Sequence, residues 1–531
     1  RGGAGVWLGR VLPQMFTFQV LGAGTAKEEG IPPVEGKIVS VNLEVERKYD
    51  VGAGFRVPDL RGVAGCADVG TSRTRTLTAL YFDTPDLRLI SRGVTLRHRT
   101  GDDEGWDLRL PAGEGRREIH DPAGREEGVP ERLARLVTAF VRGRELVPVA
   151  ELTTVRTERS LLAETGAVLA ELADDTVTAR RLDDPTTAPD RRSWREIGVE
   201  LVSGRPDVLD AVGKRLRKAG ARVGRSSSRL SIALGGGEDR PGCQGGTDTA
   251  AEVLTSYLGR QSEALLAYDP LVRLAEHDDD SVHKMRVAAR RIRSVLRTHR
   301  KLLEQQRTRA LDAELRWLTD ALGEVRDLEV LRARFDRRLA AIPEVDGRPA
   351  FMVGLAARER QARERLRQTL SSPRYAALLD SLDIFVADPP VTERATGKPE
   401  KQTAKVIGRA WRKMLRAYAE AEGRPAGVDR DGSLHRTRKA AKRLRYTAEA
   451  AAPALGKPAR KLARRAERVQ DVLGVYQDGV VAARQARRLA DEPGGRPGDL
   501  YTLGVLAGDS RRAAQQAGDE IAGVWEKAVS R

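Results

Sequence analysis

Between Val41 and Leu234, hydrophobic and polar residues alternate with a period of two, which is typical of strands that bury one face. Glycine, proline and aspartate separate these runs at short, even intervals. This spacing predicts an antiparallel barrel or sandwich, with helical patches at Val129–Arg142 and Asp207–Ala219. The predicted strands are Leu43–Tyr49, Arg75–Phe82, Gly93–Arg99, Trp106–Leu110, Ala167–Leu172 and Trp194–Val202.

After residue 235 the pattern changes to a helical period. A glycine-rich stretch, Gly235–Thr247, marks the change, and a proline-rich break at Ala387–Lys401 divides the helical segment. We therefore predict an α+β multidomain protein in which an antiparallel β domain precedes an all-α domain. The predicted boundaries are a disordered or non-native tail at 1–40, the β domain at 41–235, a linker at 236–249, and the helical domain at 250–531, with halves of about 250–386 and 402–531.

The two halves of the helical segment carry the same two motifs in the same order. His283–Arg293 (HKMRVAARRIR) matches His435–Arg445 (HRTRKAAKRLR), and Asp320–Asp327 (DALGEVRD) matches Asp471–Asp478 (DVLGVYQD). The matched motifs lie 152 and 151 residues apart. This nearly constant offset predicts a tandem duplication of a unit of a few helices.

The charge balance of the chain is strongly basic. Its formal net charge is +17 and its pI is about 10.1, which favours polyanionic partners such as nucleic acid, an anionic membrane or polyphosphate. A GC-rich genome, whose codons favour arginine, would produce the same charge balance. The placement of the charges therefore matters more than their number. Aromatic residues make up only 4% of the chain, which argues against a surface that stacks nucleic-acid bases.

The cysteines and the hydropathy bear on where the chain acts. Cys66 and Cys243 are far apart and match no metal-binding spacing, so we expect a reducing, cytoplasmic location. The sequence contains no run of about 18 apolar residues, so we expect no membrane span. No Ser-His-Asp or Cys-His arrangement is evident, and we expect no covalent intermediate.

Charged residues gather on one face of the first predicted strand. Because alternate residues of a strand share a face, Glu44, Glu46 and Lys48 point the same way. Two neighbouring carboxylates repel each other unless a cation lies between them, and hard oxygen ligands suit Mg²⁺ or Mn²⁺. The alternative is a solvated face of a surface strand, which is the commoner fate of such residues.

Several other strands repeat this charged face. Arg97 and Arg99 share one face, as do Glu196 and Glu200, and Arg109 alternates with two leucines. Charged side chains on one side of many strands predict a barrel with a charged interior, which is costly to desolvate without compensation. A polyphosphate with a metal ion would compensate it, because guanidinium groups bind phosphate oxygens in pairs.

The ordered series of these motifs resembles the CYTH domain, the fold of triphosphate tunnel metalloenzymes. The resemblance runs from about Val41 to Leu234. It rests on Glu44–Lys48 (EVERK), Tyr81–Asp86 (YFDTPD), Gly93–Arg99 (GVTLRHR), Trp106–Pro111 (WDLRLP), Arg117–Glu118 and Glu196–Glu200. It implies an eight-stranded antiparallel β-tunnel that binds a triphosphate with one or two divalent metal ions. Members of the family hydrolyse inorganic triphosphate, thiamine triphosphate or RNA 5′ ends, or cyclise ATP.

The resemblance also implies roles for individual residues. The implied metal ligands are Glu44, Glu46, Glu196 and Glu200; the phosphate-binding residues are Lys48, Arg97, Arg99, Arg109, Arg117, Arg156 and Arg229; and the catalytic carboxylates are Glu44, Glu46 and one of Asp174 and Asp175. One position departs from the family, whose closing strand commonly reads Glu-x-Glu-x-Glu. The middle residue here is Gly198, and the loss of a ligand there would weaken a second metal site and slow or abolish hydrolysis.

In the helical segment, basic residues form a stripe in each half. On a helix, spacings of three and four residues place side chains on one face. The stripe consists of His283, Arg286, Arg290, Arg293 and Arg297, and it recurs at His435, Arg438, Lys442 and Arg445. A solvated helix face usually mixes charges of both signs, whereas a stripe of one sign repels itself. Its recurrence in both halves therefore favours a functional stripe.

Both copies of both motifs resemble the CHAD domain, from about Ala250 to Ser530. The resemblance implies two helical bundles related by a pseudo-twofold axis, with basic faces that line a groove for inorganic polyphosphate. The implied phosphate contacts are His283, Lys284, Arg286, Arg290, Arg291, Arg293, His435, Arg438, Lys442, Arg443 and Arg445. The acidic residues of the second motif, Asp320, Asp327, Asp471 and Asp478, are expected to orient these arginines.

These features lead to one main hypothesis and two alternatives. The main hypothesis is a cytoplasmic polyphosphate-binding protein, associated with polyphosphate granules, whose β domain is a metal-dependent triphosphatase that uses Mg²⁺ or Mn²⁺. The first alternative is a non-catalytic protein whose barrel binds polyphosphate without hydrolysing it, and Gly198 favours this alternative. The second alternative is a basic nucleic-acid-binding protein, against which the few aromatics and the lack of a recognition motif argue.

Overall fold

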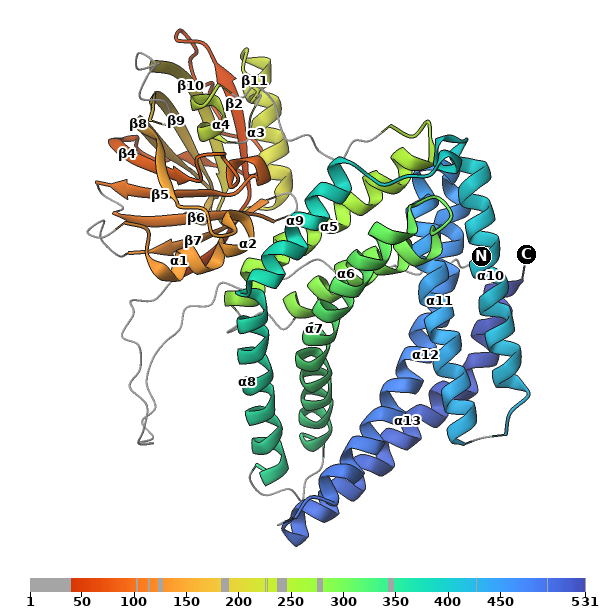
Figure 1. The fold of residues 1–531 in the computed structure, drawn as a ribbon. Coiled ribbons are helices and arrows are strands. Elements are labelled where there is room, and N and C mark those ends of the chain that lie inside the picture. Colours follow the sequence, from red (N-terminus) through yellow and green to blue (C-terminus); the bar gives the residue numbers. More distant parts are fainter. Residues whose placement is uncertain are drawn as a thin grey trace, which may run out of the picture. The chain divides into compact units, whose positions relative to one another are not determined.

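The computed structural model describes residues 40–530, apart from 102–103, 113–114, 123–127, 183–190, 225, 227, 236–245, 275–279, 342–347, 426 and 494. The predicted tail at 1–40 therefore lies almost entirely outside the described residues, and most of the predicted linker at 236–249 does too. The remaining chain consists of an antiparallel β region followed by a helical region (Figure 1). The predicted fold class is confirmed.

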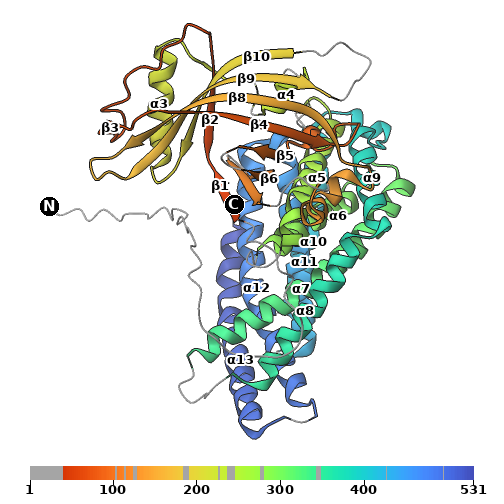
Figure 2. The same cartoon turned by 90° about the vertical axis from the view of Figure 1, so that its left-hand side faces the viewer.

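The β region is one antiparallel sheet with the strand order β1-β7-β6-β5-β4-β8-β9-β10-β2-β11, and β3 pairs with β8. Its long strands run side by side in Figure 2. The strands are β1 (Ser40–Glu44), β2 (Glu46–Val51), β3 (Asp68–Val69), β4 (Arg73–Asp83), β5 (Thr95–Thr100), β6 (Gly105–Ala112), β7 (Gly115–Asp121), β8 (Val147–Leu162), β9 (Val168–Arg181), β10 (Arg191–Leu201) and β11 (Arg222–Val223).

The sheet curls because the first described segment of the chain, β1 and β2, pairs with a strand at each end of the sheet. β1 pairs with β7, whereas β2, which follows after Val45, pairs with β10. The backbone N–H of Leu201 donates to the carbonyl of Val45 at 3.0 Å, so the ladder continues across the break. If β1 and β2 count as one bent strand and the two-residue strands β3 and β11 are set aside, the described sheet has the eight strands that were predicted.

Helix α3 (Pro206–Lys218) determines which strand positions face outward. Its apolar residues, among them Val208 and Leu216, pack against Tyr49, Ile197 and Val199 from β2 and β10. Because alternate positions face opposite sides, Glu46, Lys48, Gly198 and Glu200 face the inside of the curl. The β region also contains α1 (Glu131–Leu136), α2 (Thr138–Val141), α4 (Arg229–Ala233) and the 3₁₀ helix η1 (Ile90–Arg92).

The helical region repeats a pattern of long antiparallel helices. Its helices are α5 (Ala250–Leu274), α6 (Ser281–Thr298), α7 (Gln305–Leu339), α8 (Ala350–Leu370), α9 (Pro373–Ala387), η2 (Glu393–Thr396), α10 (Pro399–Glu422), α11 (Val428–Leu455), α12 (Lys457–Ala490) and α13 (Pro497–Val529). The two copies of the histidine-containing motif lie in α6 and α11, and the two Asp-x-Leu-Gly motifs lie in α7 and α12. Equivalent motifs thus occupy equivalent helices.

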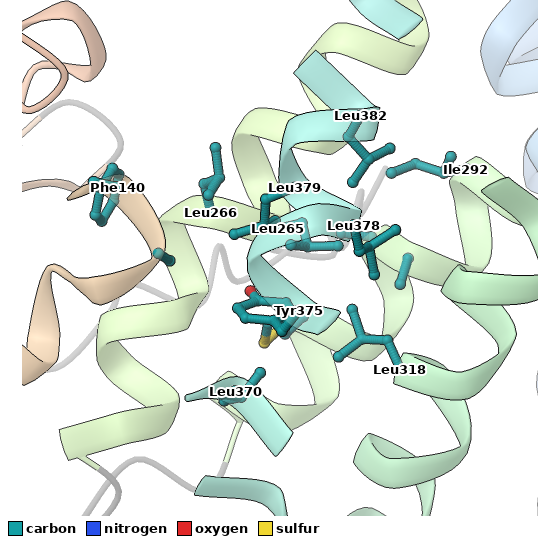
Figure 3. Close-up of a cluster of buried hydrophobic side chains, with 14 of the residues drawn as sticks. Phe140, Leu265, Leu266, Ile292, Leu318, Leu370, Tyr375, Leu378, Leu379 and Leu382 are labelled. Carbon is teal, nitrogen blue, oxygen red and sulfur yellow. The ribbon is translucent and has the colours of Figure 1, made fainter. Parts of the chain in front are cut away.

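Each half of the helical region has its own buried core. In the first half, Leu265 of α5, Ile292 of α6 and Leu318 of α7 surround the buried leucines of α9 (Figure 3). In the second half, buried Met414 packs within the cluster of α10, α11, α12 and α13. Among the described residues, no helix combines the length and the apolar content that a membrane crossing requires.

Candidate functional site

The inward faces of the strands enclose a charged cavity of about 70 Å³. Its lining includes Glu46, Lys48, Arg97, Arg99, Arg109, Arg156, Glu158, Glu171, Gly198, Glu200 and Arg229. Six cationic residues that were expected in the tunnel thus line one cavity, and they come from strands and a helix, α4, that are far apart in the sequence. A volume of this size holds about a few water molecules, so a triphosphate could enter only if side chains moved.

On one side of the cavity, arginines of β5 and β6 are paired with buried carboxylates. Arg97 donates to Asp107 at 3.0 Å and to Glu118 at 3.2 Å. Arg109 donates to Glu118 at 2.9 Å and to Glu44 at 3.0 Å. These arginines are therefore preorganised, but a phosphate must compete with carboxylates for them.

On the other side, two more cationic groups converge on Asp175 of β9. Arg156 donates two hydrogen bonds to Asp175, both at 2.9 Å, and Arg229 contacts the same carboxylate. Asp174 lies on the outer face, where Arg195 binds it at 2.8 and 2.7 Å. Of the two aspartates, the structure therefore places Asp175 beside the tunnel cations.

Glu196 is fully engaged by donors in the same area. Lys48 donates to it at 3.2 Å, Arg229 at 2.7 Å, and the indole of Trp194 at 2.9 Å. Although burial alone would raise the pKa of Glu196, the charges of Lys48 and Arg229 lower it well below its usual range. Glu196 therefore acts in this structure as a partner of two tunnel cations, in contrast to the expected role of a metal ligand.

Three further carboxylates crowd together on the inner face. Glu46 lies opposite Glu200 in the register of β2 and β10. Burial, followed by a hydrogen bond with Glu118, raises the pKa of Glu44 to about 8, and burial and the charge of Glu46 raise the pKa of Glu200. Burial would raise the pKa of Glu46, but the charges of Lys48 and neighbouring arginines outweigh this effect and lower the pKa.

Gly198 has a geometric consequence for this group. A Cβ atom at this position would lie 2.7 Å from Oε1 of Glu46. The carboxylate of Glu46 therefore occupies space that a side chain at position 198 would need. The departure from the family pattern thus removes one carboxylate and lets another move into its place.

The donor set of the tunnel is chemically suited to a hard divalent cation. Glu44, Glu46 and Glu200 supply oxygen ligands, and burial, followed by the influence of neighbouring acids, raises the pKa of Glu44 and of Glu200, which a bound cation would counteract. Across the described part of the chain, however, no three histidine, cysteine, aspartate or glutamate side chains form a ready-made metal cluster. Side chains would have to rotate to bring these three carboxylates together.

The sequence reasoning missed several tunnel residues. Glu118 binds Arg97 and Arg109, so Glu118 and Arg116, two positions away, face inward on β7. Burial and the nearby charge of Arg109 lower the pKa of Arg116. Arg117, the expected phosphate contact, lies between them on the opposite face. Only the alternation within Arg116–Glu118, together with the register of β7, could have revealed this.

In the helical region, α6 and α11 form the two walls of a basic groove of about 230 Å³. The groove is lined by Arg290, Arg293, Ser294 and Arg297 of α6 and by Lys439, Lys442, Arg443 and Tyr446 of α11. No acidic residue is part of this lining. Arg290, Arg293 and Arg297 of the first expected stripe thus lie along one groove with Lys442 of the second.

Several groove cations have no carboxylate partner. Among the described residues, no ion pair involves Arg290, Lys442 or Arg443, whereas Arg293 is held by Asp312 at 3.1 Å. Burial, followed by the charges of Arg290 and Arg438, lowers the pKa of Lys442 to about 7. The groove therefore combines three cations without a carboxylate partner with Arg293 and Arg297, which share Asp312, so its positive charge is only partly compensated.

The other expected groove contacts divide into two kinds. His283 and His435 lie near the groove cations, and burial and adjacent positive charges lower the pKa of both. Arg291 and Arg445 bind the same carboxylate, Glu449, at 3.2 and 2.8 Å. Lys284 forms an ion pair with Asp280 within its own helix. Arg291, Arg445 and Lys284 are thus each paired with a carboxylate.

One geometry occurs twice and explains the Asp-x-Leu-Gly motif. Arg286 forms an ion pair with Asp327 at 3.0 Å, and its guanidinium lies 3.1 Å from where a Cβ atom of Gly323 would be. In the second half, Arg438 is 3.7 Å from Asp478 and 3.2 Å from the corresponding point of Gly474. The glycine provides space for the arginine, and the second aspartate of the motif holds it.

The first aspartates of these motifs play a different part. Asp320 pairs with Arg316 of its own helix at 3.6 Å, and Asp471 accepts a hydrogen bond from Gln470. Neither interaction involves a groove arginine. The expected orienting role therefore finds support in Asp327 and Asp478 only.

Comparisons with known proteins agree with this architecture. The family model of the CYTH domain matches residues 42–227, and that of the CHAD domain matches residues 256–487. The chain is 35% identical over 517 residues to protein Rv2226 of Mycobacterium tuberculosis H37Rv, covering 93% of this chain and 98% of that protein. The same identity and coverage are found for MT2285 of strain CDC 1551.

Two solved structures are similar to part of the chain. PptA from Streptomyces chartreusis is 22% identical and covers 52% of this chain and 99% of its own, with a TM-score of 0.43. The CHAD domain from the plant Ricinus communis is 25% identical and covers 54% of this chain and 94% of its own, with a TM-score of 0.44.

The space beside Gly323 and Gly474 leads to a test that separates stability from binding. In Gly323→Ala and Gly474→Ala, the flexible guanidinium of Arg286 or Arg438 would be displaced, while the helix would gain up to about 1 kcal/mol in propensity. We expect each variant to melt no lower than the wild type but to bind inorganic polyphosphate about tenfold more weakly, as for the loss of one charge-assisted hydrogen bond.

Gly523→Ala in α13 is the matched control, because a Cβ atom there meets nothing within 4 Å. Thermal unfolding and equilibrium binding would be measured for all three variants. Unchanged binding in Gly323→Ala and Gly474→Ala would show that Arg286 and Arg438 do not contact the ligand.

Proposed function

Because the chain belongs to the proteins in which a CYTH domain is followed by a CHAD domain, we propose that it binds inorganic polyphosphate in the α6–α11 groove and hydrolyses a triphosphate in the β-tunnel. A cytoplasmic location and association with polyphosphate granules are part of the same proposal. The observation that carries it is the groove, in which cations from both halves meet without carboxylates in the lining.

Inorganic polyphosphate suits this groove for physical reasons. Its repeating negative charges would neutralise like-charged side chains that otherwise repel one another. Arg290 and Arg293 can each bind phosphate oxygens with two N–H groups. Lys442 of α11 adds a compact charge to the same groove. The groove lining contains one aromatic residue, Tyr446, so that it offers little for stacking successive nucleic-acid bases.

For the tunnel, we propose Glu44, Glu46 and Glu200 as the residues that would hold Mg²⁺ or Mn²⁺. A bound divalent ion would polarise phosphate oxygens and neutralise their charge. Lys48, Arg97, Arg99, Arg109 and Arg156 would hold the triphosphate, with Arg116 added to this set. Asp175 and Glu196 position Arg156, Arg229 and Lys48 through the contacts described above.

The proposed reaction needs no covalent intermediate. A tunnel carboxylate orients a water molecule toward the terminal phosphorus, and the lining cations stabilise the charge that develops on its oxygens. The anhydride bond breaks, which releases orthophosphate and pyrophosphate from inorganic triphosphate. Arg97 and Arg109 are largely buried, so they act there more strongly than in solution.

A barrel that binds without hydrolysing is the second candidate, and Gly198 favours it. The glycine removes a carboxylate from the inner face of β10, and Glu46 lies against the vacated space. Fewer oxygen ligands would lower the affinity for metal and slow the chemistry. This candidate shares the proposed polyphosphate groove and differs only in the tunnel.

Phosphate release separates the two candidates. We expect the wild type to release phosphate from inorganic triphosphate with Mg²⁺ or Mn²⁺, and Glu44→Ala/Glu46→Ala to lose at least about a hundredfold in rate, since removal of stabilising groups at a charged transition state commonly has effects of this size. The assay would also compare long-chain polyphosphate, ATP and thiamine triphosphate as substrates.

Glu151→Gln is the matched control, because Glu151 is paired with Arg180 on the outer face of β8. It should retain the wild-type rate. Equal phosphate release by the wild type and by Glu44→Ala/Glu46→Ala would rule out catalysis in the tunnel.

The pKa of Lys442 predicts that binding in the groove takes up protons. In the free protein this pKa is about 7, and a bound polyanion raises it by favouring the charged form. Above pH 7, affinity for polyphosphate should therefore fall by up to about tenfold per pH unit from this group. His283 and His435, whose pKa values are also lowered, should contribute in the same direction near and below pH 6.5.

Lys442→Arg keeps the charge and removes the titration. Calorimetry at pH 8 in buffers of different ionisation enthalpy should show less proton uptake for this variant than for the wild type. The same uptake in both proteins would contradict a role for Lys442 in contacting the polyanion.

A further inference from the structure

Helix α10 carries a second basic stripe that neither motif predicts. From residue 401 to residue 419 the helix has no acidic residue. It carries six basic ones, Lys401, Lys405, Arg409, Arg412, Lys413 and Arg416, and all six are exposed. The opposite face of the helix is apolar and buried, through residues that include Val406, Ala410 and Met414. The cations therefore occupy the face that α10 leaves outside the core.

This stripe is not neutralised within the chain. Among the residues that the structure describes, no carboxylate forms an ion pair with any of the six cations of α10. Some exposed helix arginines elsewhere have such a partner, as Arg374 has Glu314. A stripe of six like charges destabilises its own helix, so its presence calls for a compensating partner.

The stripe lies on a helix that packs against α11, one wall of the groove, because Ala410 and Met414 of α10 share a buried cluster with Leu444 of α11. Arg443 lines the groove, and its positive charge is the main cause that lowers the pKa of Lys413. At the end of α6, burial and, in smaller part, the charge of Arg409 lower the pKa of His299 to about 4. Lys413 and Arg409, on successive turns of α10, thus lie near Arg443 of α11 and the end of α6, respectively.

The duplicated half shows that the fold does not require these charges. With the offset of 152 residues, Val406 and Ala410 correspond to Leu254 and Leu258 of α5, which are buried in the same way. Lys405 and Arg409 correspond to Val253 and Tyr257, and these two side chains are buried in α5. At these two positions the face is therefore buried and apolar in the first half and exposed and cationic in the second half, whereas Arg412 corresponds to Arg260, which is also exposed.

We propose that the exposed stripe of α10 is a further segment of the phosphate track, which extends the α6–α11 groove and gives the protein a preference for long polyphosphate chains. This inference rests on the proposed polyphosphate-binding function. From Lys401 to Arg416 the stripe is about 22 Å long, at about 1.5 Å per helical residue. A short chain fills the groove alone, whereas a longer chain continues along α10.

The test compares short and long chains on three variants of the full chain. In the stripe variant, Lys405→Gln, Arg409→Gln, Lys413→Gln and Arg416→Gln are combined. In the groove variant, Arg290→Gln is combined with Lys442→Gln. We expect the stripe variant to bind long-chain polyphosphate at least tenfold more weakly, with a shallower salt dependence, and to bind inorganic triphosphate in the groove as the wild type does. The groove variant should lose affinity for long chains and should lose triphosphate binding in the groove, while triphosphate binding in the tunnel remains.

The matched control combines Arg360→Gln, Arg484→Gln, Arg487→Gln and Arg488→Gln. These arginines are exposed and lie in α8 and in the C-terminal part of α12, near the separate core cluster that contains Phe335. The control removes the same charge as the stripe variant and should leave long-chain binding within about twofold of the wild type.

The outcomes distinguish the two proposals. If the wild type bound neither ligand, or if the groove variant bound both as the wild type does, the proposed function itself would fail. If the groove variant lost binding but the stripe variant matched the control, only the extension along α10 would be overturned. Equal weakening in the stripe variant and the control would also overturn it, because the effect would then reflect net charge alone.

Discussion

Positive side chains that converge on a concave surface repel one another, and the rest of this structure depends on how that repulsion is relieved. In the β-tunnel, buried carboxylates relieve it: Asp107, Glu118, Asp175 and Glu196 each bind at least one arginine. In the α6–α11 groove the lining contains no carboxylate. The tunnel is thus internally neutralised, whereas the groove is prepared for an external polyanion.

This difference separates the two sites energetically. A ligand in the tunnel must replace carboxylates at the arginines, which favours a compact, highly charged group accompanied by a cation that takes over those carboxylates. A ligand in the groove meets Arg290, Lys442 and Arg443 without a carboxylate partner among the described residues, and competes with one carboxylate, Asp312, for Arg293 and Arg297. In the proposed function, the groove is the site where chain length contributes to affinity, and the proposed track along α10 adds to the length over which it does so.

Both sites could be predicted in outline from local periodicity. A period of two was enough to place Glu46 with Lys48 on one face of their strand and Arg97 with Arg99 on one face of theirs. Spacings of three and four residues were enough to align the stripe of α6. The choice between Asp174 and Asp175 depends on the pairing of β9 with β8, and local sequence does not specify that pairing. The same holds for Arg116 against Arg117, because a shift of one residue exchanges the two faces of a strand.

Other features needed the tertiary structure. The carboxylates expected to bind metal are not equivalent, since Glu196 is engaged by Lys48, Arg229 and Trp194, which come from three separate segments. The spacing of the cations in α10 can be read from the sequence, but their significance comes from the neighbouring Arg443. The central claim is that the groove presents its charge to a phosphate chain. Competition between long-chain polyphosphate and duplex DNA of equal phosphate number, at one salt concentration, tests it most directly: polyphosphate should displace the DNA, and preferential retention of DNA would contradict the account.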